Sequence, residues 1–164
     1  MTRLAPLSFA AHGSLGWRPT VSSVVPGQGA AVALCMDELP GFALRLPLAI
    51  QRQRGRARPV VPVRGVRAGG LPLLDEAGTW RARIVPFALR RGPFQAVRTE
   101  GTETVFVDET ALSPPGGAVV PLFDGPGTLS AVTRDHLSAL AGWQAGLARA
   151  ERAASALQAA RLLR

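Results

Sequence analysis

The chain has no lysine, no asparagine and no tyrosine, and its only isoleucines are Ile50 and Ile84. These are residue types whose codons are rich in A and T, so their shared scarcity indicates a GC-rich bacterial genome. Basic charge is therefore carried by arginine alone, and an arginine here cannot be interpreted as chosen over lysine for its bidentate geometry. The formal net charge of +8 stands regardless and favours acidic partners such as nucleic acid, anionic lipid or an acidic protein.

Groups that could hold a metal or a cofactor are also scarce. The single cysteine, Cys35, excludes an intrachain disulfide, and its apolar surroundings predict a buried, inert thiol. His12 and His136 have no companions at ligand spacing, so no metal site is predicted. The segment GQGAAV has only two of the three glycines of a dinucleotide fingerprint, and a phosphate-binding loop needs a lysine. We therefore expect no cofactor.

Long apolar runs are missing as well. No segment reaches the roughly 20 apolar residues that span a bilayer. The start of the chain has only a weak apolar run, which Pro6 and Ser8 interrupt, so it lacks the core of a signal peptide. The expectation is a soluble cytoplasmic protein without a membrane span.

What the chain does have is an apolar content of 47% in 164 residues, enough to form the core of one domain. Short apolar runs separated by glycine and proline predict strands over residues 21–25, 30–36, 42–50, 59–66, 94–99, 104–109 and 118–123. Trp80, Ile84 and Phe87 recur at helical spacing, which predicts a short inserted helix over about residues 80–91, with Pro86 in its first turns or at a kink.

Beyond Gly127 the pattern becomes helical. Thr128 or Ser130 is a plausible N-cap, and apolar residues then form one stripe at Leu140, Trp143, Leu147, Ala150, Ala154 and Leu157. The predicted fold is α+β: a largely antiparallel sheet, open or partly barrel-like, with the inserted helix and a long C-terminal helix or helix pair. The β-rich domain covers residues 1–127, and residues 128–164 form a helical segment packed on it. Its last part, residues 149–164, is long for a small domain and is a candidate for docking a partner helix.

A basic run places Arg52, Arg54, Arg56 and Arg58 at alternate positions. On one extended strand all four would face one side, whereas around a hairpin tip at Gly55 they would splay. A solvated hairpin and a contact with phosphates or an acidic surface are both open. Single-stranded nucleic acid is disfavoured, because no aromatic residue for base stacking occurs between Phe42 and Trp80.

Asp124 begins the sequence DGPGT, which we expect to open the last helix. Free amides at a helix start could hold an anion, but Asp124 would repel it, so a capped turn is the alternative.

The most informative stretch is WRARIVPFALRRGPF, from Trp80 to Phe94. It resembles the SapC family of bacterial proteins, which carry a tryptophan, an aromatic-Ile-Pro segment and then Arg-Arg-Tyr-Pro-Phe. The matching residues here are Trp80, Pro86, Arg90, Arg91, Pro93 and Phe94, while Gly92 stands where the family has tyrosine. The sequences VFVDE and LFDGPGT are also similar to elements of that family.

The family is named for a surface-array-linked gene and has no established activity or catalytic residues. The resemblance implies an accessory role, because genes of the family are often associated with those of outer-membrane receptors and flavin-dependent halogenase-like proteins. Our main expectation is a non-catalytic accessory or interaction protein that binds a partner protein or peptide. The alternatives are an enzyme subunit acting on a peptide or small anionic substrate, and an anion or nucleic-acid binder using the basic hairpin.

Candidate binding residues follow from the same stretch. Trp80, Phe87 and Phe94 are expected mainly as core anchors. Arg90 and Arg91 lie about 100° apart on a helix, so one of them could pair with Asp108 or Asp124 while the other stays exposed for a ligand. The candidate partner- or ligand-binding residues are therefore Trp80, Arg90, Arg91, Phe94 and Asp124.

Overall fold

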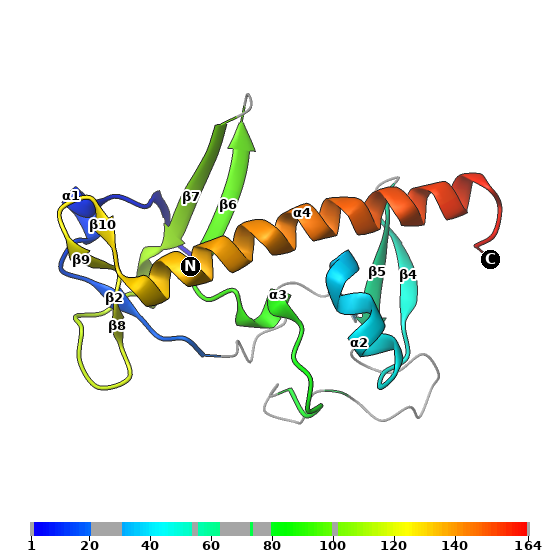
Figure 1. Ribbon diagram of the computed structural model, residues 1–164, viewed down its shortest axis with the longest axis horizontal. Coiled ribbons are helices and arrows are strands. Elements are labelled where there is room, and N and C mark those ends of the chain that lie inside the picture. The colour runs from blue at the N-terminus through cyan, green and yellow to red at the C-terminus, as the bar shows by residue number, and fades with distance from the viewer. Residues whose placement is uncertain are drawn as a thin grey trace. The chain divides into compact units, whose positions relative to one another are not determined.

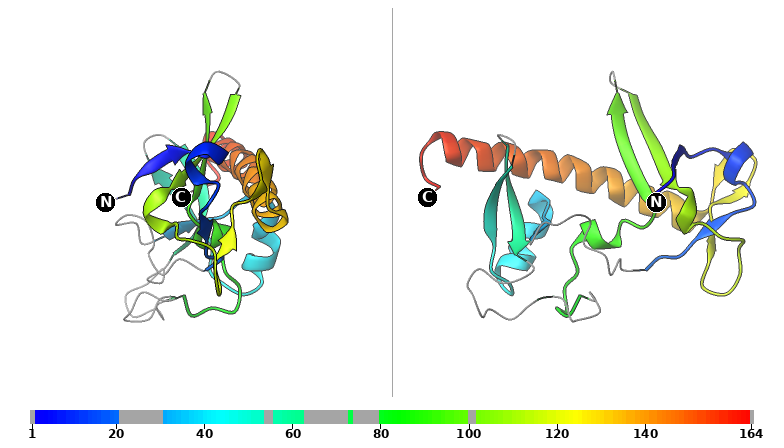
Figure 2. Two further views of the ribbon diagram at one scale, coloured as in Figure 1. Left: turned by 90° about the vertical axis from the view of Figure 1, so that its left-hand side faces the viewer. Right: turned by 180° about the vertical axis from the view of Figure 1, so that it is seen from behind.

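The structure is a computed structural model that describes residues 2–20, 31–53, 56–62, 73, 80–99 and 102–163 (Figures 1 and 2). It contains several small antiparallel sheets, short helices and one long helix, α4 (Ala131–Ala159). The predicted α+β class is confirmed, although the strands form separate small sheets instead of one large one. None of the described helices is long and apolar enough to cross a membrane.

The chain divides into two compact units, each of which combines distant parts of the sequence. Unit 1 consists of Met1–Val21 and Arg91–Ala141, and unit 2 consists of Ser22–Arg90 and Gly142–Arg164. The boundary predicted after residue 127 separates the helix from the strands, whereas each of these units includes a part of α4. An amphipathic helix of this length has enough surface to bury different turns against different partners.

Unit 1 is built on a three-stranded sheet in the order β1-β7-β6. These strands are β1 (Leu4–Pro6), β7 (Thr102–Asp108) and β6 (Phe94–Thr99). Two strand pairs accompany the sheet: β2 (Gly16–Trp17) with β8 (Val120–Pro121), and β9 (Phe123–Gly125) with β10 (Thr128–Leu129). The short helices are α1 (Phe9–His12) and the 3-10 turn η2 (Glu109–Ala111).

Unit 2 contains a second three-stranded sheet, in the order β3-β5-β4. Its strands are β3 (Ala31–Ala33), β5 (Arg56–Pro62) and β4 (Ala49–Gln53), and its short helices are η1 (Met36–Glu38), α2 (Leu39–Ala43) and α3 (Phe87–Arg90). One buried apolar cluster unites these elements, formed by Val32, Leu34, Phe42, Val61, Trp80 and Leu89.

Several of the predicted elements differ from the structure. The strand expected over 30–36 is shortened to β3, because Met36 begins η1, and the one expected over 118–123 is divided between β8 and β9. The helix expected over residues 80–91 is limited to α3, because the indole Nε1 of Trp80 donates to the Ile84 carbonyl (2.7 Å) in a non-helical bend and Pro86 disfavours helix before it. The strand expected over 42–50 begins only at Ala49, because Pro40 in the first turn of α2 favours a helix there. The strand expected over 21–25 lies outside the described residues.

The long helix is a single one, not a helix pair. Ser130 is its N-cap, since the Ser130 Oγ accepts from the Thr133 amide (3.3 Å). At the other end, the Leu162 amide donates to the Leu157 carbonyl and the Arg161 amide to the Gln158 carbonyl. These two bonds, with Arg161 in the left-handed region (φ 58°), make a Schellman C-cap.

Candidate functional site

The aromatic residues predicted as anchors are buried, each within its own unit. Trp80 is 8% exposed and belongs to the core of unit 2. Phe94 is 1% exposed in unit 1 and meets the ring of Trp17 edge-on, with 5.0 Å between the ring centroids. Both side chains thus act in packing, and neither offers a face to a ligand.

The backbone conformation explains why residue 92 is glycine, where the family has tyrosine. Its φ of +62° is in the left-handed region, and a Cβ there would lie 2.9 Å from the Trp17 ring. A larger residue would therefore be strained and would also displace Trp17.

Arg90 is the exposed member of the Arg-Arg pair. Its Cζ lies 5.6 Å from the centroid of the Phe87 ring, within cation–π distance. The Phe87 ring in turn contacts Trp143 of α4, with the centroids 5.8 Å apart and the planes inclined by 33°. Phe87 thus contacts both Arg90 and Trp143, and we call these three residues the Arg90 stack.

Glu38 holds this stack together and is a residue that the sequence analysis missed. Its Oε1 accepts from the Phe87 amide (2.7 Å), and its Oε2 accepts from the Trp143 Nε1 (3.2 Å) and the Cys35 amide (3.0 Å). In the sequence, Asp37 and Glu38 are adjacent carboxylates of the kind that usually lie in turns or on the surface. The available signal was the capping-box spacing from Cys35 to Glu38, which is weak because cysteine is not a preferred N-cap.

Arg91 has a different setting and belongs to unit 1. It is partly buried, and its backbone carbonyl lies 3.0 Å from the Nε2 of His136, which donates to it. Arg3 pairs with Glu109 and Arg149 pairs with Asp37, and within the described residues neither Arg90 nor Arg91 has an ion pair.

Asp108, an expected partner of the arginine pair, is engaged locally. Its Oδ1 accepts from the amide and hydroxyl of Thr110 and from the Arg3 amide. Burial by itself raises the pKa of Asp108, but these hydrogen bonds outweigh it and hold that pKa below the usual value. The carboxylate therefore caps η2.

Asp124 is exposed on β9, and the sequence that follows it forms the β9–β10 turn, with Gly127 at a φ of +70°. The expectation that DGPGT opens the last helix is wrong, because α4 starts at Ala131 after the Ser130 cap. A turn between two strands has no helix start at which an anion could bind.

The basic run forms an antiparallel hairpin of β4 and β5, in which Arg52 is paired with Ala57 and Arg58 with Gln51. Paired residues share a face and neighbouring positions alternate, so Arg52 and Arg58 lie on opposite faces. Arg54 and the side chain of Arg56 lie outside the described residues. The geometry matches the splayed alternative and not a single basic face.

A second polar cluster that the sequence did not reveal surrounds His12 in unit 1. The imidazole is 1% exposed, and its Nε2 lies 3.3 Å from the Glu109 Oε1. Glu109 also pairs with the Nε of Arg3 at 2.8 Å, while the Nδ1 of His12 faces the backbone of Ser8. These contacts join the start of the chain to η2, so the cluster serves to fix the fold.

Cys35 is buried, as predicted. Burial raises the pKa of the Cys35 thiol, which keeps it protonated and unreactive at neutral pH. Within the part of the chain that the structure describes, no three His, Cys, Asp or Glu side chains gather as a metal ion would require.

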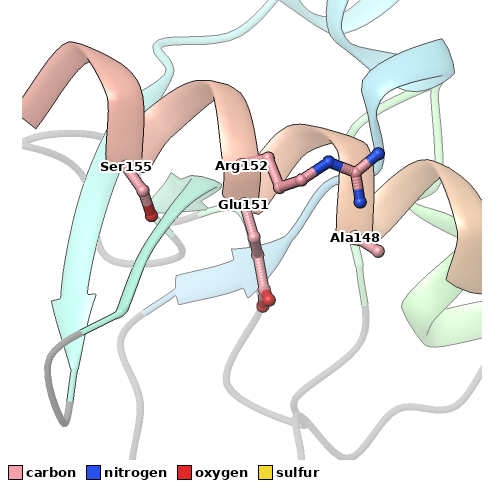
Figure 3. A pocket seen from close by; sticks show the side chains of 4 residues that line it. All are labelled: Ala148, Glu151, Arg152 and Ser155. Carbon is pink, nitrogen blue, oxygen red and sulfur yellow. The ribbon is translucent and has the colours of Figure 1, made fainter.

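One face of α4 bears an open hollow of about 410 Å³ (Figure 3). Its described lining residues are Ala148, Glu151, Arg152 and Ser155. Neither Arg90 nor Arg91 is among these lining residues. An enzyme acting on an anionic substrate through one of these arginines would need a deep pocket beside it.

The geometry thus defines a two-unit α+β protein whose most distinctive segment, Trp80 to Phe94, supplies core anchors and the exposed side chains of Arg81, Arg83 and Arg90. Comparison with known families assigns it: the SapC family model matches residues 7–164. Because the match covers essentially the whole chain, the protein belongs to the SapC family. No curated protein and no solved structure matches the chain.

Proposed function

We propose that this SapC-family protein is a non-catalytic accessory protein that binds a partner protein or peptide. The observation that carries the proposal is the Arg90 stack, in which the family's Arg-Arg element presents a fixed guanidinium at the surface. Fixed, exposed arginines over aromatic rings are typical of protein interfaces, where arginine is enriched.

The polar side chains support a binding role over a catalytic one. Glu38 is engaged by three N–H donors, Asp108 caps a turn and His12 is buried against Glu109. In each case the carboxylate or imidazole is occupied in holding backbone segments together. A general base has to reach a substrate proton, which these groups are not free to do.

The test is a nuclease-treated pull-down of the tagged chain from its host, followed by reconstitution of the pair from purified proteins. We expect one stoichiometric protein that also binds the purified chain by isothermal titration calorimetry. Recovery of nucleic acid alone, and only when nuclease is omitted, would contradict the proposal and favour the basic hairpin as an anion-binding element. An empty pull-down would also contradict it and would favour the enzyme-subunit alternative.

A further inference from the structure

The guanidinium of Arg90 is held in position without a carboxylate. It lies over the Phe87 ring, which also contacts the Trp143 indole, and the Phe87 backbone amide donates a hydrogen bond to Glu38. Because both the ring and the backbone of Phe87 are held in place, the guanidinium of Arg90 loses less conformational freedom on binding than a free surface arginine would.

The carboxylates of Asp37 and Glu38 already have other hydrogen-bond partners. Asp37 pairs with the guanidinium of Arg149 at 2.7 Å, and Glu38 accepts its hydrogen bonds from neutral N–H groups. Within the described ranges Arg90 has no ion pair, and its side chain is exposed. The charge of Arg90 is therefore available to an acceptor from outside the chain.

The chemistry of the acceptor follows from the surroundings. The segment Trp80 to Phe94 contains four arginines and no acidic residue, so it attracts negative charge. A guanidinium binds a carboxylate through two parallel N–H···O bonds. Phe87 is only 9% exposed and its ring contacts both Arg90 and Trp143, so little of it is accessible for a nucleic-acid base to stack on.

We propose that Arg90 is the binding site for a carboxylate side chain in an acidic segment of the partner protein. The inference rests on the proposed function and names the partner chemistry of the same surface. The inference concerns Arg90 and not Arg91, because Arg91 is partly buried and the aromatic contact belongs to Arg90.

The test uses the full chain, a fluorescein-labelled hexaglutamate peptide as probe, and fluorescence anisotropy at 150 mM salt. We expect Arg90→Ala to weaken binding about tenfold and Arg90→Lys several-fold, because lysine keeps the charge but loses the planar fork. The matched control is Arg152→Ala, which removes the same charge from an exposed position in unit 2 and should change the affinity less than twofold. Circular dichroism melts confirm that each variant is folded.

A second readout is the indole Nε1–H resonance of Trp143 in a ¹H–¹⁵N spectrum during an acetate titration. We expect this resonance to shift in the natural chain and to stay fixed in Arg90→Ala. Equal losses of peptide affinity in Arg90→Ala and Arg152→Ala would overturn the inference, because binding would then follow net charge alone. A partner captured equally well by Arg90→Ala would overturn it too, while leaving the proposed accessory function intact.

Discussion

The two units hold the same helix in opposite ways. In unit 1 the large side chain comes from outside the helix: Trp17 donates its indole N–H to the Thr133 hydroxyl (3.0 Å) and packs against His136. In unit 2 the large side chain belongs to the helix: Trp143 donates to Glu38, and the following turns bury the small residues Gly146, Ala150 and Ala154.

The acceptors differ in a way that matches their burial. Thr133 is completely buried, and a hydroxyl can be buried there at low cost because Ser130 and the Pro121 carbonyl complete its hydrogen bonds. Glu38 is only partly buried, and its two carboxylate oxygens accept from three donors. The two units therefore differ in their acceptors: a hydroxyl, Thr133, serves the fully buried site in unit 1, and a carboxylate, Glu38, serves the partly buried site in unit 2.

The largest effect is expected in unit 1, from Trp17→Ala. This change removes a side chain that is 1% exposed and leaves a cavity, so the free energy of unfolding should fall by about 3–5 kcal/mol. Chemical denaturation measures it. Trp17→Phe, which keeps a ring but loses the bond to Thr133, should cost clearly less; equal losses for the two variants would mean that packing contributes little.

The next effect concerns the charged acceptor of unit 2. Glu38→Gln keeps one acceptor oxygen but turns an amide N–H₂ toward N–H donors, so it should lower the free energy of unfolding by about 1–3 kcal/mol. The adjacent Asp37→Asn is the control, since the Asp37–Arg149 pair is exposed and is expected to contribute less than about 1 kcal/mol. Denaturation curves that coincide for the two variants would contradict the central position of Glu38.

Two glycines of α4 sharpen the comparison further. A Cβ at Gly142 would meet nothing within 4 Å, so Gly142→Ala should stabilise the protein by roughly 0.5–1 kcal/mol through helix propensity. A Cβ at Gly146 would lie 3.1 Å from the Cβ of Cys35, so Gly146→Ala should destabilise it by about 1 kcal/mol through overpacking. Thermal melts of the pair should shift in opposite directions, and a rise in both would show that Cys35 moves aside freely.

The smallest effect is expected at the end of the helix. Arg161 has a φ of 58°, which glycine adopts without strain, so Arg161→Gly should raise the free energy of unfolding by about 0.5–1 kcal/mol. Differential scanning calorimetry measures the shift. Arg152→Gly, in the middle of the helix, is the contrasting variant and should lower stability; a loss in both would show that the Schellman cap does not form in solution.

Local patterns predicted much of the fold. The strand over residues 94–99 and the Ser130 N-cap were recognisable because alternation and capping depend on neighbouring residues. The short helix α2 and the reduced length of α3 were not recognised, since both depend on how proline and a buried tryptophan fit a particular core.

The candidate site followed the same division. The sequence predicted Arg90 and Arg91 as candidate binding residues. The choice between them needed the structure, because the neighbours of two adjacent side chains are decided only when the chain folds. Glu38 was missed because two of its three donors lie 49 and 105 residues away, at Phe87 and Trp143. No local pattern carries information over such separations.

The sequence by itself determined the α+β class, the long C-terminal helix and the burial of Trp80, Phe94 and Cys35, because composition and periodicity reflect which residues leave water. The family was indicated by the resemblance of the stretch from Trp80 to Phe94 to the SapC pattern. Only the tertiary structure decided that α4 is shared between two units, that the basic run splays over both faces of a hairpin and that Arg90 stays exposed on Phe87. Those outcomes depend on strand register and on contacts between distant residues, which are fixed when the chain packs.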